Sequence, residues 1–158
     1  MGDKELQSAT RSFISLDLFC NPCGVTLTMK QANAWTTLDP INASVCFRHF
    51  RNRINKKLFG NAAKRFHTFT PIVALIEKSL SGRYHYHCVI DRPARISCAA
   101  FEHIVSTQWA NTPFGYTEID FQHEIDSGWI AYITKRSQKS NFGDSIDWLN
   151  TQISRPMS

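Results

Sequence analysis

Two neighbouring segments of strand character constrain the fold of this chain more than any other feature. The stretch from Arg83 to Asp91 (RYHYHCVID) is aromatic, β-branched and apolar, with no glycine or proline before Pro93, which is typical of a β-strand. The stretch from Thr70 to Lys78 (TPIVALIEK) has the same character, and a short loop containing Gly82 separates the two. We therefore predict that the two segments pair as an antiparallel hairpin.

Alternation along these strands brings three chemically active side chains together. Successive side chains of a strand point to opposite faces of the sheet, so His85 and His87 share a face. In a hairpin centred near Ser81, Glu77 falls opposite His85, and any register that pairs odd with odd positions keeps it on the same face. Two imidazoles and a carboxylate on a rigid sheet predict a metal site.

The rest of the chain predicts one α+β domain around that hairpin. Its 158 residues, 42% hydrophobic and 20% charged, suffice for a globular domain with its own core. Hydrophobic periodicity, capping residues and breakers predict five further elements: a strand at Gly24 to Lys30, helices at Asn42 to Phe59 and Ser97 to Trp109, a strand at Gly115 to Ile125, and a helix from Gly128 to Gln138. The order βαββαβα is typical of a ferredoxin-like or palm-type fold, with a mostly antiparallel sheet, helices mainly on one face and the other face partly free. We predict an N-terminal arm or short helix at 1–23, the domain at 24–140 and a C-terminal tail at 141–158.

Positive charge favours a polyanionic partner, because the formal net charge is +5. Basic side chains concentrate on the helix predicted at Asn42 to Phe59 and just after it, and others lie near the end of the last predicted helix. We predict that eight of them contact nucleic-acid phosphates: Arg48, Arg51, Lys56, Lys57, Lys64, Arg65, Arg136 and Lys139. The alternative interpretation is an ordinary solvated helix face.

Cysteine usage and hydropathy bear on the compartment. The chain has five cysteines, an odd number, and no apolar stretch near the ~18 residues of a membrane span. These features predict a reduced, cytoplasmic compartment, in a bacterium or in the host cell of a virus or mobile element, and no membrane partner. Cys20 and Cys23 form a lone CxxC, and two thiolates are too few for a structural zinc site, so packed or exposed thiols are the favoured interpretation.

The last predicted helix carries a second group of chemically active residues. Tyr132, Lys135, Arg136 and Lys139 follow at helical spacing on one face. A tyrosine hydroxyl ionises near pH 10, so it is a poor nucleophile unless a metal activates the electrophile. A phosphodiester is the electrophile that suits a cationic protein. We predict that Tyr132 attacks the scissile phosphate and that Lys135 either steadies the charge of the transition state or lowers the pKa of Tyr132.

These residues resemble the motifs of a known family. His85-Tyr86-His87 resembles the HUH motif (histidine, hydrophobic residue, histidine), and the run from Tyr132 to Lys135 resembles the Y-x-x-K motif that accompanies it. Glu77, eight residues before His85, stands where the replication-initiator (Rep) branch has its third metal ligand. The strand from Val25 to Lys30 stands where the first Rep motif, a threonine-containing strand, would lie. The resemblance covers about residues 24 to 139.

The resemblance to HUH endonucleases implies a function. It implies nicking of single-stranded or hairpin DNA with Mg²⁺ or Mn²⁺, a 5′-phosphotyrosine link and a free 3′-OH, most simply as a rolling-circle replication initiator. It implies the single-tyrosine class, because the other nearby tyrosine, Tyr116, is predicted on a strand. One departure is Tyr86, which is larger than the aliphatic residue usual between the two histidines. A second departure is that these residues include no helicase segment, so we expect unwinding to come from a partner such as a host helicase, from DNA that is already single-stranded, or from a further part of the protein.

Several alternatives remain open from the sequence. An HUH transposase or relaxase would use the same motifs. A non-haem Fe(II) oxygenase also binds its metal with two histidines and one carboxylate. A non-catalytic nucleic-acid-binding domain could stack bases on Tyr84 and Tyr86, although these lie on the face opposite the histidines. If the face of Glu118, Asp120 and Gln122 is the open one, those side chains could contribute to the site, whereas His123 is predicted to lie among apolar neighbours.

Overall fold

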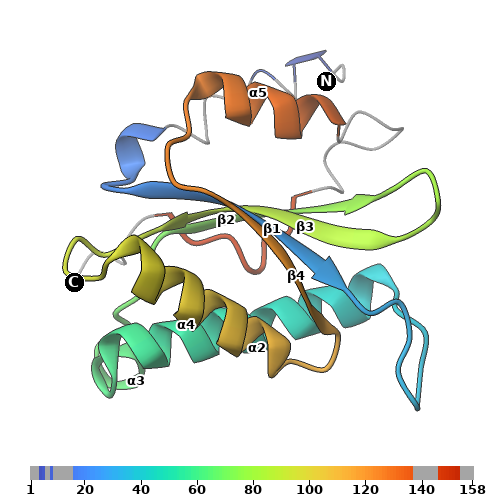
Figure 1. Cartoon of the computed structure of the whole chain (residues 1–158), viewed down its shortest axis with the longest axis horizontal. Helices are drawn as coiled ribbons and strands as arrows, with labels where there is room; N and C mark the ends of the chain where they lie inside the picture. The colour runs from blue at the N-terminus through green and yellow to red at the C-terminus, as the bar shows by residue number, and fades with distance from the viewer. Residues whose placement is uncertain (1–3, 6–7, 9–15, 137–145, 154–158) are drawn as a thin grey trace.

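The fold is a four-stranded antiparallel sheet with helices on both faces. The computed structural model describes residues 4–5, 8, 16–136 and 146–153 (Figure 1). The named elements are, in chain order, η1 (Leu16–Leu18), β1 (Pro22–Met29), α2 (Pro40–Phe59), α3 (Ala62–Arg65), β2 (Ile72–Lys78), β3 (Tyr84–Asp91), α4 (Cys98–Ala110), β4 (Gly115–Gln122) and α5 (Ser127–Arg136). The predicted order of strands and long helices is confirmed, and η1 and α3 are short additions to it. Most of the predicted N-terminal arm lies outside the described residues.

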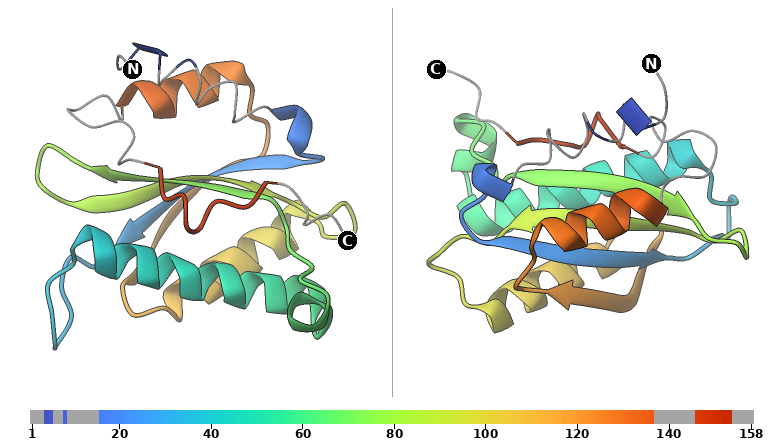
Figure 2. Two further views of the ribbon diagram at one scale, coloured as in Figure 1. Left: turned by 180° about the vertical axis from the view of Figure 1, so that it is seen from behind. Right: turned by 90° about the horizontal axis from the view of Figure 1, so that it is seen from above.

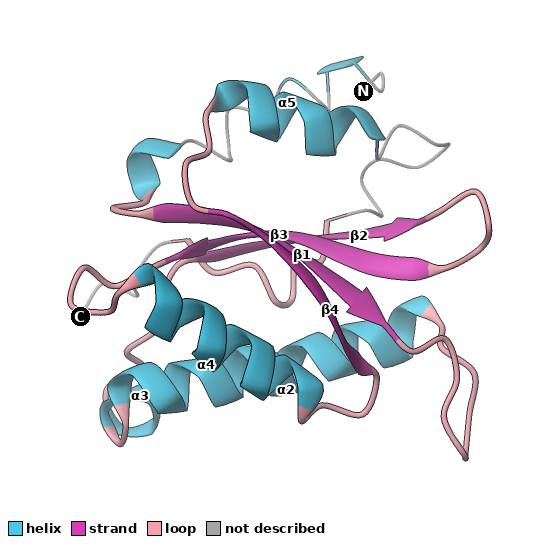
Figure 3. Cartoon of the chain, in the orientation of Figure 1, coloured by secondary structure: helices cyan, strands magenta, loops and turns pink. Residues whose placement is uncertain are grey.

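The strands lie in the order β2-β3-β1-β4, and every neighbouring pair is antiparallel. Helices α2, α3 and α4 cover one face, and α5 lies over the other (Figures 1 and 3). The predicted α+β class, with its helices mainly on one face, is therefore confirmed. The hairpin strand β3 is an inner strand, held by backbone hydrogen bonds on both sides.

Alternation along the strands divides the interior into two cores. Toward α2 and α4, strand residues such as Leu27, Ile72 and Tyr86 pack with Phe47 and Trp109. Toward α5, the alternate strand positions form a smaller cluster with the helix and η1: Phe19, Val73, Leu75, Val89, Ile130, Ile133 and Ile146. Because this smaller core covers only part of its face, the rest of the face stays open to solvent.

The helix ends follow local chemistry. α2 begins after Asp39, whose carboxylate accepts a hydrogen bond of 2.7 Å from the backbone of Asn42, so the helix starts two residues before the predicted position. It ends at Phe59, the predicted last residue, and the C-cap residue Gly60 adopts a positive φ of 60°. α4 begins after Ser97, the predicted cap, whose hydroxyl accepts a hydrogen bond from the backbone of Ala100.

Residues 146–153 pair with the outer edge of β2, which the sequence pattern does not indicate (Figure 2). Ile146 is opposite Leu75, and Gln152 exchanges two backbone hydrogen bonds with Ile72. The segment covers a sheet edge that would otherwise present unpaired N–H and C=O groups. The interval predicted as a C-terminal tail therefore contains a segment that is built into the sheet.

This C-terminal segment is fastened by a buried carboxylate. Asp147 accepts hydrogen bonds from the hydroxyl of Tyr86 (2.8 Å), from the hydroxyl of Ser44 (3.1 Å) and from the amide of Asn150 (2.8 Å). Burial, and next the Asp147 carboxylate, raise the pKa of Tyr86, so its hydroxyl stays protonated and donates. Tyr86, the residue between the two histidines, therefore has a structural role, because its hydrogen bond to Asp147 joins β3 to the C-terminal segment and, through Ser44, to α2.

We expect Asp147→Ala to lower the free energy of unfolding by about 1–3 kcal/mol, because it leaves the buried Tyr86 hydroxyl without its acceptor. Tyr86→Phe should cost less, since Asp147 keeps its other donors. Urea denaturation of the two single variants and the double variant measures both effects. If Tyr86 and Asp147 stabilise the fold through their hydrogen bond, the double variant should lose less free energy of unfolding than the sum of the two single variants, because it leaves no unpaired hydroxyl. A loss equal to that sum would show that the hydrogen bond contributes nothing.

Candidate metal site and adjoining cavity

Three predicted ligands meet on the open face of the β2–β3 hairpin. Glu77 pairs directly with His85, as predicted for a hairpin centred near Ser81. His87 lies one alternation further along β3, opposite Leu75. His87 is buried, and Glu77 and His85 are half-buried. The three ligands, called the triad below, therefore belong to two hydrogen-bonded strands and not to loops.

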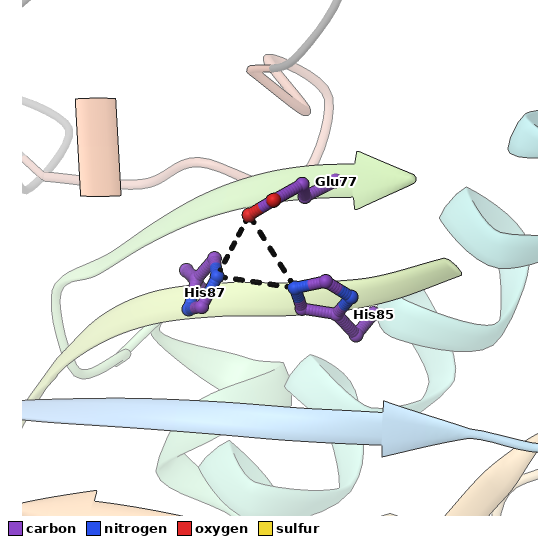
Figure 4. A group of neighbouring side chains, drawn as sticks. All are labelled: Glu77, His85 and His87. Atoms are coloured by element: carbon purple, nitrogen blue, oxygen red, sulfur yellow. Dashed lines mark hydrogen bonds and ion pairs between the residues drawn. The ribbon is translucent and has the colours of Figure 1, made fainter. Parts of the chain in front are cut away.

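The ligand atoms of the triad converge on one point (Figure 4). The Oε2 atom of Glu77 lies 2.9 Å from Nε2 of His87 and 3.4 Å from Nε2 of His85, and the two Nε2 atoms are 3.1 Å apart. For metal–ligand bonds of about 2.1 Å, adjacent ligands of an octahedral cation lie about 3.0 Å apart. The observed spacing and the mixed N/O donors therefore fit a divalent cation. Among the described residues, no other cluster of metal-ligand side chains is this compact.

Thr26 orients one of the imidazoles. It is opposite His87 in the β1–β3 pairing, and its hydroxyl lies 3.1 Å from Nδ1 of His87. A proton on Nδ1, donated to this hydroxyl, leaves the lone pair of Nε2 facing Glu77 and His85. Sequence reasoning noted a threonine-containing strand but missed this contact, because only the register between β1 and β3 shows which threonine meets which histidine.

We expect Thr26→Val to weaken Mn²⁺ binding by about 10- to 100-fold, the usual effect of removing a hydrogen-bond partner of a histidine ligand. Thr26→Ser, which keeps the hydroxyl, should bind Mn²⁺ nearly as the parent does. Isothermal titration with Mn²⁺ alone measures both affinities. Equal loss in the two variants would show that strand packing, and not the hydroxyl, is what matters.

The triad opens into a cavity of about 650 Å³ between the sheet and α5. His85, His87 and Tyr132 all line it, and Tyr132 exposes 53% of its surface. Other side chains of the lining come from β1, β4 and the adjoining loops and include Thr26, Thr28, Gln31, Arg83, Tyr116, Glu118, Asp120 and Gln122. The face of β4 that carries Glu118, Asp120 and Gln122 is the open one, because all three side chains line the cavity, and their contribution to the site stays a prediction.

A close approach between α5 and β1 brings Tyr132 to this cavity. Gly24 lies beneath the indole of Trp129, and a Cβ atom on Gly24 would stand 2.6 Å from that ring. α5 can therefore pack this closely on β1 only where β1 has no side chain. The helix begins at Ser127, and Asp126 accepts a hydrogen bond from the backbone of Trp129.

The predicted basic contacts divide into two groups. Arg51, Lys56 and Lys64 line a second cavity on the α2 side of the sheet. Arg48, Lys57 and Arg65 are exposed on the same helical layer. The side chains of Lys135 and Arg136, and the whole of Lys139, lie outside the described residues.

The remaining predicted residues lie away from the triad. Cys20 is exposed and Cys23 is buried, and burial raises the pKa of the Cys23 thiol to about 12. His123 lies between Cys23 (3.6 Å) and Glu102 (3.6 Å), so its predicted place at the rim of the apolar side is observed. No helix in the described part of the chain is long and apolar enough to cross a membrane.

Comparison with known families adds an independent observation. The model of the replication-associated protein ORF2/G2P family matches residues 22–141. The chain belongs to this family. The match runs from β1 through α5 and includes the triad, Thr26 and Tyr132. As a replication-associated ORF2/G2P protein, the chain is assigned to replication, in line with the Rep-type resemblance. Comparison with curated proteins found no match, and comparison with solved structures found none either.

Proposed function

We propose that this replication-associated ORF2/G2P protein is a metal-dependent endonuclease that nicks single-stranded DNA through a 5′-phosphotyrosine and so initiates rolling-circle replication. The observation that supports it best is the shared cavity. The triad on the hairpin and Tyr132 on α5 are 45 or more residues apart in sequence, yet His85, His87 and Tyr132 line one space. A nucleophile beside a metal site is the arrangement that such a cleavage requires.

The triad would hold Mg²⁺ or Mn²⁺ through Glu77 Oε2 and the Nε2 atoms of His85 and His87. When bound, the cation supplies positive charge that polarises the phosphodiester and offsets the charge that develops during its cleavage. Thr26 would accept the Nδ1 proton of His87 and so leave the Nε2 lone pair for the cation. Because the ligands belong to paired strands, little reorganisation is needed to receive the ion.

Tyr132 would be the nucleophile. Its hydroxyl oxygen forms a bond to the scissile phosphorus, the bond from phosphorus to the 3′ oxygen breaks, the phenolic proton passes to solvent, and the 3′ oxygen takes up a proton to leave as a 3′-OH. One phosphodiester replaces another, so the step needs no external energy source and can run backward to rejoin the strand. Lys135, three residues further along α5, keeps its proposed role in steadying the transition-state charge.

A covalent adduct tests the proposal directly. The protein is incubated with Mn²⁺ and a pool of single-stranded oligonucleotides, and the products are separated under denaturing conditions. We expect a denaturant-resistant protein–DNA adduct, abolished by chelator, whose modified peptide contains Tyr132 by mass spectrometry. A modified residue elsewhere would reassign the nucleophile, and no adduct across a diverse pool would refute the proposed chemistry.

The alternatives have less support. Tyr86 is fully buried against Phe47, so it is not available to stack a base, as a non-catalytic nucleic-acid-binding domain of this layout would require. The family favours replication over the transposase and relaxase versions of the same chemistry. An Fe(II) oxygenase would not need Tyr132, so loss of activity in Tyr132→Phe separates it from the proposed nuclease.

A further inference from the structure

A second cavity lies on the other side of the molecule from the triad. It has a volume of about 700 Å³ and is formed by the C-terminal half of α2, by α3 and the loop that follows, and by Gln152. Gln152 pairs with Ile72 at the start of β2, whereas Glu77 lies five residues later, about 17 Å along an extended strand. The sheet therefore lies between this cavity, called the α2–α3 cavity below, and the triad. The two sites are also displaced from each other along the direction of β2.

The lining of the α2–α3 cavity is cationic and has no carboxylate. Arg51, Lys56 and Lys64 contribute positive charge, and the other polar side chains are amides, a hydroxyl and an imidazole. Neither Lys56 nor Lys64 forms an ion pair within the described part of the chain. Arg51 donates a hydrogen bond of 2.9 Å to the carbonyl of Leu149, which fixes its position at the cavity wall. One fixed guanidinium and two lysines without an ion pair around a hollow suit a phosphate group.

The loop after α3 adds two observations that point to the same ligand. His67 lines the cavity and has a φ of 51°, the left-handed region that a residue with a Cβ seldom adopts. Such local strain is concentrated at binding and catalytic sites. Its neighbour Phe66 exposes 75% of its surface beside the cavity residues. An uncovered aromatic ring next to cations is the combination that binds an unpaired base together with its phosphates.

We propose that the α2–α3 cavity binds an unpaired nucleotide and its flanking phosphates in the DNA, as a second contact separate from the cleavage cavity. The inference rests on the proposed DNA partner and adds a site to it. Lys56 and Lys64 bind phosphate, and Phe66 stacks on the base. Because the two cavities lie on opposite faces of the sheet, one strand has to pass around an edge of the sheet to occupy both.

Binding of a fluorescent oligothymidine of about 30 nucleotides, followed by anisotropy over a range of salt concentrations, tests the inference. The double variant Lys56→Ala, Lys64→Ala should reduce the slope of log affinity against log salt by about 1.4, which is about 0.7 for each lost phosphate contact. Phe66→Ala should weaken binding at least about fivefold. All three side chains are exposed, so the variants should fold normally, which circular dichroism checks.

A control variant with the same charge change is available in the chain. Lys30→Ala, Arg53→Ala also removes two exposed cations, but neither residue lines the cleavage cavity or the α2–α3 cavity. Because Arg53 donates a hydrogen bond to the buried Gln108, circular dichroism checks the fold of this variant too. It should leave the salt slope nearly unchanged. Equal effects of the two double variants, or no effect of Phe66→Ala, would overturn the inference. So would binding of inorganic phosphate at this cavity, detected by NMR, without any loss of oligonucleotide affinity in the lysine variant.

The variant His67→Asn separates an effect on binding from an effect on folding. It keeps a residue type that tolerates the left-handed region, so we expect an unchanged Tm with weaker oligonucleotide binding. Unchanged binding would remove His67 from the site.

The adduct assay and the binding assay together separate the two proposals. If the lysine double variant forms the adduct normally and binds the oligonucleotide with normal affinity, the second contact is rejected and the proposed nuclease activity stands. Absence of any adduct in the parent protein would reject the nuclease while the binding measurements still decide the cavity.

Discussion

Tyr132→Phe is expected to abolish covalent capture of single-stranded DNA, with adduct yield falling by at least about 10³-fold. The ring stays in place and only the attacking oxygen is lost, so neither the packing of α5 nor the triad should change. Tyr132 is half-exposed and lines the cavity, so the substitution keeps the ring and changes only the hydroxyl. The measurement is denaturing electrophoresis of labelled oligonucleotide with Mn²⁺, and binding of Mn²⁺ and of oligonucleotide should both stay at the parent level.

Tyr116 provides a matched control for this experiment. It lines the same cavity, is also partly exposed, and belongs to β4 rather than to α5. Tyr116→Phe should form the adduct within about threefold of the parent, because its hydroxyl is not the proposed nucleophile. The reverse result, with Tyr116→Phe inactive and Tyr132→Phe active, would move the nucleophile to β4. Equal loss in both would indicate a shared role in binding DNA and not one attacking oxygen.

Removal of a triad imidazole is expected to have a comparably large effect through a different step. His87→Ala takes away one of three converging ligands and leaves Glu77 without its 2.9 Å partner. Mn²⁺ affinity should fall by more than about 100-fold, beyond the loss usual for changing a residue that only contacts a ligand. Isothermal titration with Mn²⁺ measures the binding, and adduct yield should fall with it.

Two comparisons make the triad prediction decisive. Tyr132→Phe should bind Mn²⁺ as the parent does, so it loses the adduct without losing the metal. Gln122→Ala, which changes an exposed cavity residue outside the triad, should keep Mn²⁺ affinity. If His87→Ala binds Mn²⁺ within about threefold of the parent, the three side chains do not form the metal site, whatever their spacing.

Local patterns in the sequence were sufficient for the hairpin and the triad. Side chains alternate with a period of two along any strand, so His85 and His87 share a face whatever the rest of the fold is. A short loop centred near Ser81 leaves little freedom of register, and Glu77 is opposite His85 as predicted. The start of α4 after Ser97 is equally local, because an N-cap needs only the serine hydroxyl and the backbone N–H of Ala100, three residues further on.

Such local patterns do not predict contacts between segments that are distant in the sequence. The pairing of Thr26 with His87 depends on which strand joins β3 and in which register. The attachment of Asp147 to Tyr86 depends on a C-terminal segment that has too few strand residues to be recognised by periodicity. The α2–α3 cavity combines residues of two helices, a loop and Gln152, and no spacing along the chain indicates that they meet.

The sequence by itself was enough to predict the candidate metal ligands and the candidate nucleophile, and the tertiary structure decided which of them share a cavity. Alternation and capping are properties of a few consecutive residues, so the triad could be derived from them. The position of Tyr132 at the cavity that His85 and His87 line requires α5 to pack closely on β1, where Gly24 makes room for Trp129. That contact joins residues about a hundred positions apart, and only packing of the complete chain can specify it.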